Sequence, residues 1–368
     1  MRVPFSFLLI LTLLFNNVSS SQEKPVKIGV VGLTHTHVHW ILGREDIGDI
    51  DIVGIVEPNK DLAERYSKQH GFSMDLVYDT MEEMVAKTKP QAVTAFGTIY
   101  AHLEVVEFCA PKGIHVMVEK PLAVSLDHAK KMEELAKKHN IHLLTNYETT
   151  WYPTNHKAKE VLESGTVGDL RKVVVRDGHK GPVKLGINQE FLDWLLDPKE
   201  NGGGAITDFG CYGANLMTWL KNGEKPNSVT AVIQQMQKAN HPKVDDDATI
   251  ILTYDDSNAT IQASWNWPMG RKDMEIYGLT GAIYADNRND LRVRIAKGYD
   301  GYDESPMKLE ELSNPYNDPF SYFAGVIKGE IKVDPNDLSA LENNMTVMEI
   351  LDAAIRSAKE GKTIYLKD

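Results

Sequence analysis

The chain contains little cysteine and no surplus of positive charge. Cys109 and Cys211 are its only cysteines in 368 residues, too few for a fold held together by disulfides. Because the pattern described below assigns them to different domains, we expect two buried free thiols. The formal net charge of −12 gives no electrostatic footprint for a phosphate backbone, so we discount nucleic acid as a partner.

The chain also lacks a hydrophobic run long enough to cross a bilayer. The apolar run from Val3 to Phe15 is shorter than the ~20 residues that a spanning helix needs. It follows Arg2 and precedes the small residues Ser19, Ser20 and Ser21, which is the pattern of a secretory signal peptide. We therefore predict a signal peptide over residues 1–21 and no stable membrane insertion after its cleavage.

Residues 24–146 alternate short apolar runs with amphipathic helical patterns, one of which starts after Ser125. This alternation predicts a Rossmann-type, doubly wound parallel sheet covered on both faces. Ligands of such sheets bind at the carboxyl ends of the strands. The strands are expected at Val26–Val31, Ile52–Val56, Ala92–Phe96, Val116–Val118 and His142–Thr145.

After residue 147 the pattern changes to strands in which apolar and polar residues alternate. Turn signals separate them, so residues 147–368 are expected to form an α+β domain with an open, mostly antiparallel sheet. The expected strands are Lys172–Arg176, Ser228–Gln234, Ala248–Tyr254, Ala259–Trp265, Met274–Tyr277 and Leu291–Ala296.

The turn after the first strand has one glycine where a dinucleotide-binding turn has three. Gly32 occupies the first position, Thr34 the second and His37 the third. In place of a close backbone approach, the Thr34 hydroxyl and the imidazole of His35 or His37 could contact the pyrophosphate. The cofactor is therefore held in an unusual way, or not at all.

Three histidines alternate in this turn: His35, His37 and His39. A metal site would need all three to converge. At a strand-to-helix turn, we expect His35 and His39 to share a face and His37 to point away. No acidic residue or cysteine stands beside them in the sequence, so we predict no metal site.

Glu57 ends the second strand, 25 residues after Gly32. An acidic residue at about this distance accepts hydrogen bonds from the adenosine ribose and repels a 2′-phosphate. Glu57 therefore favours NAD over NADP.

Two further motifs carry candidate chemistry. Lys120 follows the fourth strand in Glu119-Lys120-Pro121, where its ammonium could donate to a substrate oxygen. Asp208 and Tyr212 lie four residues apart in "GGGAITDFGCYG", so they would share one face of a helix. Tyr212 could serve as a proton donor, with its pKa lowered by a neighbouring ammonium.

With both motifs in this order, the chain resembles the Gfo/Idh/MocA oxidoreductase family over essentially its whole mature length. The resemblance implies a Rossmann domain, then a domain that binds substrate and often mediates homo-oligomerisation through its sheet. It also implies that Lys120 is the catalytic lysine and Asp208 the motif aspartate. Tyr212 stands where many members have histidine, and is read as the general acid/base, as in some sugar-oxidising members.

Other polar and aromatic residues follow predicted strand ends. Aromatic faces beside polar groups suit sugars, so we expect substrate contacts from Trp151 or its neighbour Tyr152, from His179 and from Trp267. Further candidates for the cleft are Lys180, Trp265, Arg271 and Lys272. Tyr147 or Glu148 is expected near the nicotinamide. The complete predicted cofactor set is Gly32, Thr34, His35, Glu57, Thr98, His102, Glu119, Lys120 and Tyr147.

These features predict an exported, NAD(P)-dependent oxidoreductase that acts on a hydroxyl or carbonyl group of a sugar or sugar derivative. Free cofactor is scarce outside the cytoplasm, so we expect a tightly held cofactor and a periplasmic location. Two alternatives remain. One is redox-neutral glycoside cleavage by oxidation, elimination and reduction; the other is a non-catalytic carbohydrate-binding relic.

Overall fold

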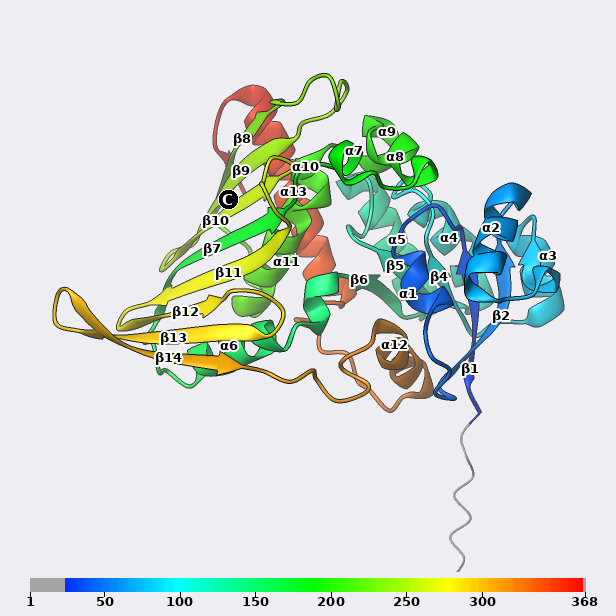
Figure 1. The fold of residues 1–368 in the computed structure, drawn as a ribbon, viewed down its shortest axis with the longest axis horizontal. Helices are drawn as coiled ribbons and strands as arrows, with labels where there is room; N and C mark the ends of the chain where they lie inside the picture. Colours follow the sequence, from blue (N-terminus) through cyan, green and yellow to red (C-terminus); the bar gives the residue numbers. More distant parts are fainter. Residues whose placement is uncertain (1–23, 367–368) are drawn as a thin grey trace, which may run out of the picture.

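The computed structural model describes residues 24–366. Two sheets lie side by side, the first at the right of Figure 1 and the second at the left, with helices between and around them. The segment predicted as a signal peptide, residues 1–21, lies outside the described residues.

The first sheet is parallel and has six strands in the order β3-β2-β1-β4-β5-β6. The predicted Rossmann-type sheet is therefore confirmed. Its shortest strand, β3, has only two residues and was not predicted, because so short a run has no periodicity. The strands are β1 (Val26–Val31), β2 (Ile50–Val56), β3 (Val77–Tyr78), β4 (Ala92–Ala95), β5 (His115–Glu119) and β6 (Leu143–Asn146).

Helices connect these strands, and most begin at a side-chain cap. The Ser125 hydroxyl accepts from the His128 amide at 3.3 Å and starts α5 as predicted. The first helix has five residues and no side-chain cap, so the nucleotide turn leads into an unusually short helix. The helices are α1 (Val38–Leu42), α2 (Lys60–His70), α3 (Met81–Thr88), α4 (His102–Cys109) and α5 (Leu126–His139), with 3-10 turns at Met74–Leu76 and Ala110–Lys112.

The second sheet has nine strands in the order β14-β13-β12-β11-β7-β10-β9-β8-β15. It is mostly antiparallel, as predicted, but β7 and β10 pair in parallel at its centre. Its strands are β7 (Leu170–Gly178), β8 (Ser228–Gln234), β9 (Asp247–Thr253), β10 (Asn258–Ser264), β11 (Arg271–Gly278), β12 (Gly281–Ala285), β13 (Asp290–Lys297), β14 (Gly301–Lys308) and β15 (Ile364–Tyr365).

Helices cover the face of this sheet that is turned toward the first sheet (Figure 1). The long ones are α6 (Pro153–Glu163), α11 (Gly210–Leu220) and α13 (Leu341–Glu360). Short helical turns join β6 to α6 and β7 to α11: η3 (Glu148–Trp151), α7 (Pro182–Leu185), α8 (Gln189–Leu195), α9 (Pro198–Asn201) and α10 (Ala205–Asp208).

One late helix returns to the first sheet. In α12 (Pro319–Lys328), Phe320 and Phe323 are buried in one cluster with Ile28 and Ile55 of the Rossmann strands. Arg44 fixes this helix from outside, since its guanidinium lies 3.0 Å from the Asp318 carboxylate that caps it. The first sheet is therefore completed by residues from near the end of the chain.

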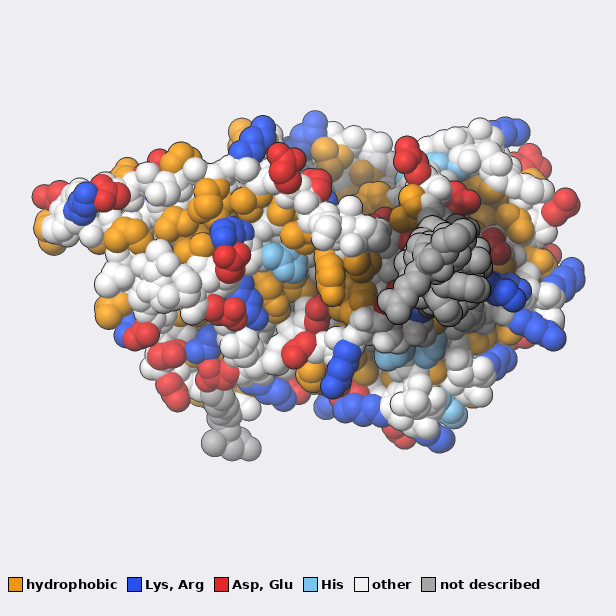
Figure 2. Space-filling model, turned by 90° about the horizontal axis from the view of Figure 1, so that it is seen from below, with side chains coloured by type: hydrophobic (Ala, Val, Ile, Leu, Met, Phe, Trp, Pro, Cys, Tyr) orange, Lys and Arg blue, Asp and Glu red, His pale blue; other side chains and the backbone are white. Residues whose placement is uncertain are grey.

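Cys109 and Cys211 are both free and buried, which confirms that prediction. None of the helices in the described part of the chain combines the length and apolarity needed to cross a membrane. On the face seen in Figure 2, acidic and basic side chains are interspersed rather than segregated.

Candidate functional site

An ion pair at the carboxyl end of β5 joins the two predicted motifs. The Lys120 ammonium contacts the Asp208 carboxylate and also donates to the Asp208 carbonyl at 2.9 Å. Both side chains are buried. Burial alone would lower the pKa of Lys120 and raise that of Asp208, but their mutual attraction outweighs it, so the pKa of Lys120 is raised and that of Asp208 is lowered. Both groups are therefore charged, and Lys120 is fixed in place.

Asp208 positions Lys120; it does not position Tyr212. The helix breaks between them at Phe209, so Asp208 and Tyr212 do not share one helix face, and that prediction is wrong. The second carboxylate oxygen of Asp208 accepts from the Trp265 indole at 3.0 Å. Trp265 is fully buried, so it supports the pair and does not face substrate.

Tyr212 lies beside this pair, with the Lys120 ammonium 5.2 Å from its ring centroid. The predicted lowering of its pKa is also wrong: burial, followed by the charge of Glu148, raises the pKa of Tyr212 well above its ordinary value. The Lys120 ammonium is paired with Asp208 and faces the Tyr212 ring, so it does not lower the pKa of Tyr212. Tyr212 is therefore a neutral phenol in this structure, ready to donate a proton or a hydrogen bond.

A cavity of about 900 Å³ lies against the second sheet, and two of the residues that line it, Phe209 and Lys272, lie beside the Tyr212 ring. Aromatic rings and charged groups share its wall. The wall includes Glu148, Tyr152, His179, Phe209, Trp267 and Lys272.

Two of the three predicted substrate residues line this cavity. His179 accepts at Nδ1 from the Gly181 amide at 3.0 Å, which leaves the proton on Nε2. Burial lowers the pKa of His179 to about 4, so it is a neutral donor. Trp267 donates its indole N–H to the Asp177 carbonyl at 3.3 Å, and the Arg271 guanidinium lies 4.5 Å from its ring centroid.

Trp151, the third predicted substrate residue, does not line the cavity. It is buried against Tyr322 in the core of the first domain, with ring centroids 5.5 Å apart. Its indole donates to Asn146 at 3.0 Å, and Asn146 donates to Glu119 at 2.8 Å. Trp151 therefore positions Glu119 from behind, while its neighbour Tyr152 faces the cavity.

Gly32 makes the nucleotide turn possible. Its φ is +80°, and a Cβ there would lie 2.8 Å from the Gly97 nitrogen, so only glycine fits between the ends of β1 and β4. The Thr34 hydroxyl two residues later is buried without a hydrogen-bond partner among the described residues. An orphaned donor at the end of the first strand fits a phosphate or ribose oxygen of a dinucleotide.

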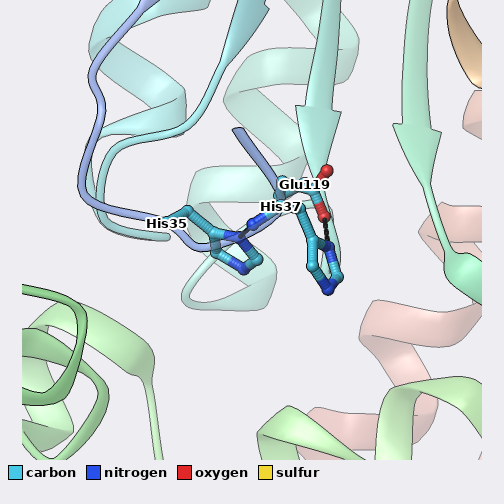
Figure 3. Close-up of side chains that lie close together, drawn as sticks. All are labelled: His35, His37 and Glu119. Carbon is cyan, nitrogen blue, oxygen red and sulfur yellow. Dashed lines mark hydrogen bonds and ion pairs between the residues drawn. The ribbon is translucent and has the colours of Figure 1, made fainter. Parts of the chain in front are cut away.

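The histidines pair differently from the prediction. Figure 3 shows the His35 and His37 rings side by side, next to Glu119, with their centroids 4.5 Å apart. His39 instead contacts His70, at 2.8 Å between ring nitrogens. His37 is therefore not turned away, and an acidic neighbour, remote in sequence, comes from β5.

Ligand atoms of His35, His37 and Glu119 lie within 4.8 Å of one another, close enough to hold a metal ion. Two of their nitrogens are already engaged. The His37 Nδ1–H donates to the Glu119 carboxylate at 2.7 Å, and His35 Nδ1 accepts from the His37 amide at 3.1 Å. Burial lowers the pKa of His35 well below its ordinary value. We therefore interpret the cluster as a hydrogen-bonded wall of the cofactor cleft.

Glu57 stands at the end of β2, where the ribose contact was predicted. Its carboxylate accepts from the amides of Leu33 at 3.0 Å and Asn59 at 2.9 Å. Burial raises the pKa of Glu57 in spite of these bonds. A carboxylate has lone pairs left after two bonds, so Glu57 fits a ribose hydroxyl and disfavours a phosphate.

Three other predicted cofactor residues make contacts with other residues of the protein. His102 donates from Nδ1 to the Leu122 carbonyl at 3.1 Å, and burial lowers its pKa to about 4. The Thr98 hydroxyl donates to Glu200 at 3.0 Å. Tyr147 is buried behind Tyr212, with ring centroids 5.4 Å apart, and supports it.

A segment that sequence reasoning missed covers His35 of the nucleotide turn. We call residues 182–201, which include α7, α8 and α9, the covering segment. Phe191 and Trp194 pack on His35 at centroid distances of 4.7 and 5.7 Å. Glu190 forms an ion pair with Arg65 on α2 and accepts from Tyr66 at 3.0 Å. The run "EFLDWLL" could have indicated an amphipathic piece, but nothing in it identified the surface it covers.

Comparisons with known proteins agree with this architecture. Residues 26–147 match the model of an oxidoreductase family with an NAD-binding Rossmann fold, and residues 155–284 match the GFO/IDH/MocA C-terminal domain. Inositol 2-dehydrogenase of Rhizobium meliloti is 23% identical over 355 residues, which cover 93% of this chain and 99% of that protein.

Trans-1,2-dihydrobenzene-1,2-diol dehydrogenase of Xenopus tropicalis is 27% identical over 217 residues. That match covers 59% of this chain and only 61% of the relative's length.

Two solved structures share the fold. The aldose-aldose oxidoreductase of Caulobacter crescentus, complexed with glycerol, has a TM-score of 0.77 at 19% identity and covers 93% of this chain and 100% of its own. An inositol dehydrogenase homologue of Azotobacter vinelandii, complexed with NAD+, has a TM-score of 0.79 at 16% identity, covering 93% and 97%.

Proposed function

Because the chain belongs to the Gfo/Idh/MocA family of NAD-binding oxidoreductases, we propose that it oxidises or reduces a hydroxyl or carbonyl group of a sugar or sugar derivative. The observation that carries this proposal is the buried Lys120–Asp208 ion pair beside Tyr212, with the Lys120 ammonium 5.6 Å from the ring centroid of Phe209, which lines the aromatic and charged cavity. The names of the inositol and aldose enzymes to which the chain is similar support a polyhydroxylated substrate.

The residues divide the chemistry as follows. NAD, when bound, supplies the hydride acceptor. Lys120 is held cationic by Asp208 and donates to the reacting oxygen. Tyr212 transfers the proton of the same hydroxyl group. His179 Nε2–H and the Trp267 ring bind the rest of the sugar from the cavity wall.

We propose further that the protein is exported to the periplasm and keeps its cofactor through many turnovers. The signal-like pattern of residues 1–21 supports export. The covering segment supports retention, because Phe191, Trp194 and the Glu190–Arg65 ion pair would have to separate from the first domain before a nucleotide could leave.

Redox-neutral glycoside cleavage is the second candidate. A cavity of about 900 Å³ is at the upper end of the size that accommodates drug-sized ligands. It therefore has room for a sugar ring together with a leaving group.

A homo-oligomer formed through the second sheet is also proposed. On the face of that sheet away from the helices, Val232 and Ile251 are 62% and 42% exposed. Light scattering on the purified protein would report a dimer or larger; a monomer at all concentrations would refute this.

The first experiment identifies the small molecule released when protein purified without added cofactor is denatured. Near-stoichiometric NAD or NADH in the mass spectrum would support retention; a protein that is empty and also fails to bind added NAD would overturn the proposal. With sugars and aryl glycosides as substrates, net NADH supports the dehydrogenase, and aglycone release without net NADH supports the cleavage. Tyr212→Phe is expected to lower either activity by at least ~10²-fold with an unchanged circular dichroism spectrum.

A further inference from the structure

Glu148 is a second ionisable group on the cavity wall beside Tyr212. It follows β6 and begins η3. Its carboxylate receives a hydrogen bond from the Tyr152 hydroxyl and an ion pair from the Lys272 ammonium of β11. The Glu148 side chain is 28% exposed, against 1% for Tyr212, so Glu148 is open to the cavity.

Lys272 brings Glu148 and Tyr212 together. Its ammonium contacts the Glu148 carboxylate and lies 5.2 Å from the Tyr212 ring centroid. Lys120 lies at the same distance from that ring, at 5.2 Å. Tyr212 is therefore flanked by two ion pairs, one buried and one facing the cavity.

Asp177 explains why Lys272 serves Glu148 alone. Asp177 pairs with Lys272 across β7 and β11, so both side chains are on the same face. Yet the Asp177 carboxyl is fully buried and neither oxygen has a partner among the described residues. Burial raises its pKa well above the ordinary value. Because neither Asp177 oxygen contacts the ammonium, Lys272 pairs with Glu148.

The environments of Glu148 and Tyr212 push their proton affinities apart. Burial would raise the pKa of Glu148, but Lys272 and the Tyr152 hydroxyl outweigh it and lower the pKa. Burial and the charge of Glu148 raise the pKa of Tyr212. Neighbouring groups separated in this way are the usual signature of an acid and a base with distinct roles.

We propose that Glu148 is the terminal proton acceptor of sugar oxidation, which rests on the oxidoreductase function proposed above. The substrate O–H bond breaks and its proton goes to the Tyr212 oxygen. The phenolic proton of Tyr212 goes to the Glu148 carboxylate. The carbon–hydrogen bond breaks with its electron pair, which leaves as hydride to NAD+, and the carbonyl C=O bond forms. Reduction reverses each transfer, so protons and electrons balance.

The charge on Glu148 depends on groups from several elements. Lys272 stabilises its carboxylate from β11 and Tyr152 from the end of η3, whereas burial opposes ionisation. The titratable and charged groups that face it are His37, Tyr152, Asp177, Tyr212, Lys272 and Arg288.

The test compares Glu148→Gln with Glu304→Gln across pH. Glu304 is a matched control, because it also pairs with a cation, Arg294 at 2.6 Å, and this pair likewise lowers its pKa. It lies on β14 and is not among the residues that line the cavity. Glu148→Gln should lower kcat for oxidation by about 10²-fold, leave KM little changed and remove the acid limb of the pH profile. Glu304→Gln should keep the wild-type profile.

A milder substitution covers the case in which Glu148→Gln fails to fold. Tyr152→Phe removes one hydrogen bond to Glu148 without changing any charge, so the acid limb should move to higher pH while activity at its plateau persists. An acid limb that stays in place in both Tyr152→Phe and Glu148→Gln would overturn the inference.

A measurement without cofactor separates this inference from the proposed function. The ultraviolet titration of tyrosine, taken as the difference between each protein and its Tyr212→Phe counterpart, should show Tyr212 ionising at lower pH in Glu148→Gln than in wild type. No shift would refute the coupling. Loss of turnover in Tyr212→Phe with a normal Glu148→Gln enzyme would refute the inference alone; normal turnover in both would refute the assignment of Tyr212 as well.

Discussion

The buried Lys120–Asp208 pair gives the sharpest test of the site. Replacing Lys120 with Met removes the ammonium but keeps a flexible chain of similar length. Among the described residues, the Asp208 carboxylate, whose side chain is 8% exposed, then retains the Trp265 indole as its one side-chain donor. Replacing Asp208 with Asn instead leaves a buried ammonium whose side chain is 7% exposed.

Each single change leaves one buried charge without its partner. Such a change costs about 3–5 kcal/mol of folding free energy. Because Trp265 still donates to Asp208, we expect Lys120→Met to cost about 3 kcal/mol, at the lower end of that range. Each kcal/mol shifts the melting temperature by about 2–4 °C in proteins of 150–250 residues and by less in longer chains, so the loss here is about 4 °C. The double variant removes both charges and should be more stable than the sum of the single changes predicts, by about 2 kcal/mol.

Urea unfolding of wild type, both single variants and the double variant measures this coupling, with turnover assayed in parallel. All three variants should be inactive, because Lys120 is absent or misplaced in each. Strictly additive losses, or a cost below about 1 kcal/mol for either single variant, would contradict the view that a desolvated ion pair fixes Lys120.

Three other outcomes follow from the structure. Gly32→Ala should destabilise the protein by about 1–3 kcal/mol and abolish NAD binding, measured by calorimetry; Gly97→Ala, whose Cβ would meet only Ala101 at 3.8 Å, should do neither. His102 has a pKa lowered to about 4, so the unfolded chain binds more protons between pH 4 and 6.5, and stability is complete above that window and falls as pH drops through it. As the pH drops through this window, the free energy of unfolding of His102→Asn should fall by about 3 kcal/mol less than that of wild type. Unfolding both proteins at several pH values measures this difference. Glu57→Gln should weaken NAD binding about tenfold or more and reduce the preference for NAD over NADP in paired titrations, whereas an unaltered preference would show that another group selects the cofactor.

Local patterns predicted the elements of the site better than its contacts. The end of β5 and the glycine-rich motif identify Lys120, Asp208 and Tyr212, because strand ends and loop chemistry are visible in a few adjacent residues. Their partners are remote. Trp265 and Lys272 come from strands that only the folded sheet brings beside Asp208 and Glu148.

The errors in the prediction have the same physical origin. His37 was expected to point away because the geometry of the strand-to-helix turn alone was considered. Its acceptor, Glu119, lies 82 residues further along the chain. The ring of Trp151 was expected at the substrate because sugars stack on aromatic rings, yet its place is set by α12, which covers it from the far end of the sequence. The covering segment was missed because the residues around Phe191 do not indicate the surface, at His35, on which it packs.

The return of α12 to the first sheet has a consequence for the order of folding. The apolar surface that Phe320 and Phe323 cover on the first domain stays open until residues 319–328 have left the ribosome. Contacts of such high sequence separation form slowly, so the nascent first domain cannot close on its own. Under the export proposed above, this delay would keep the chain unfolded for longer before translocation.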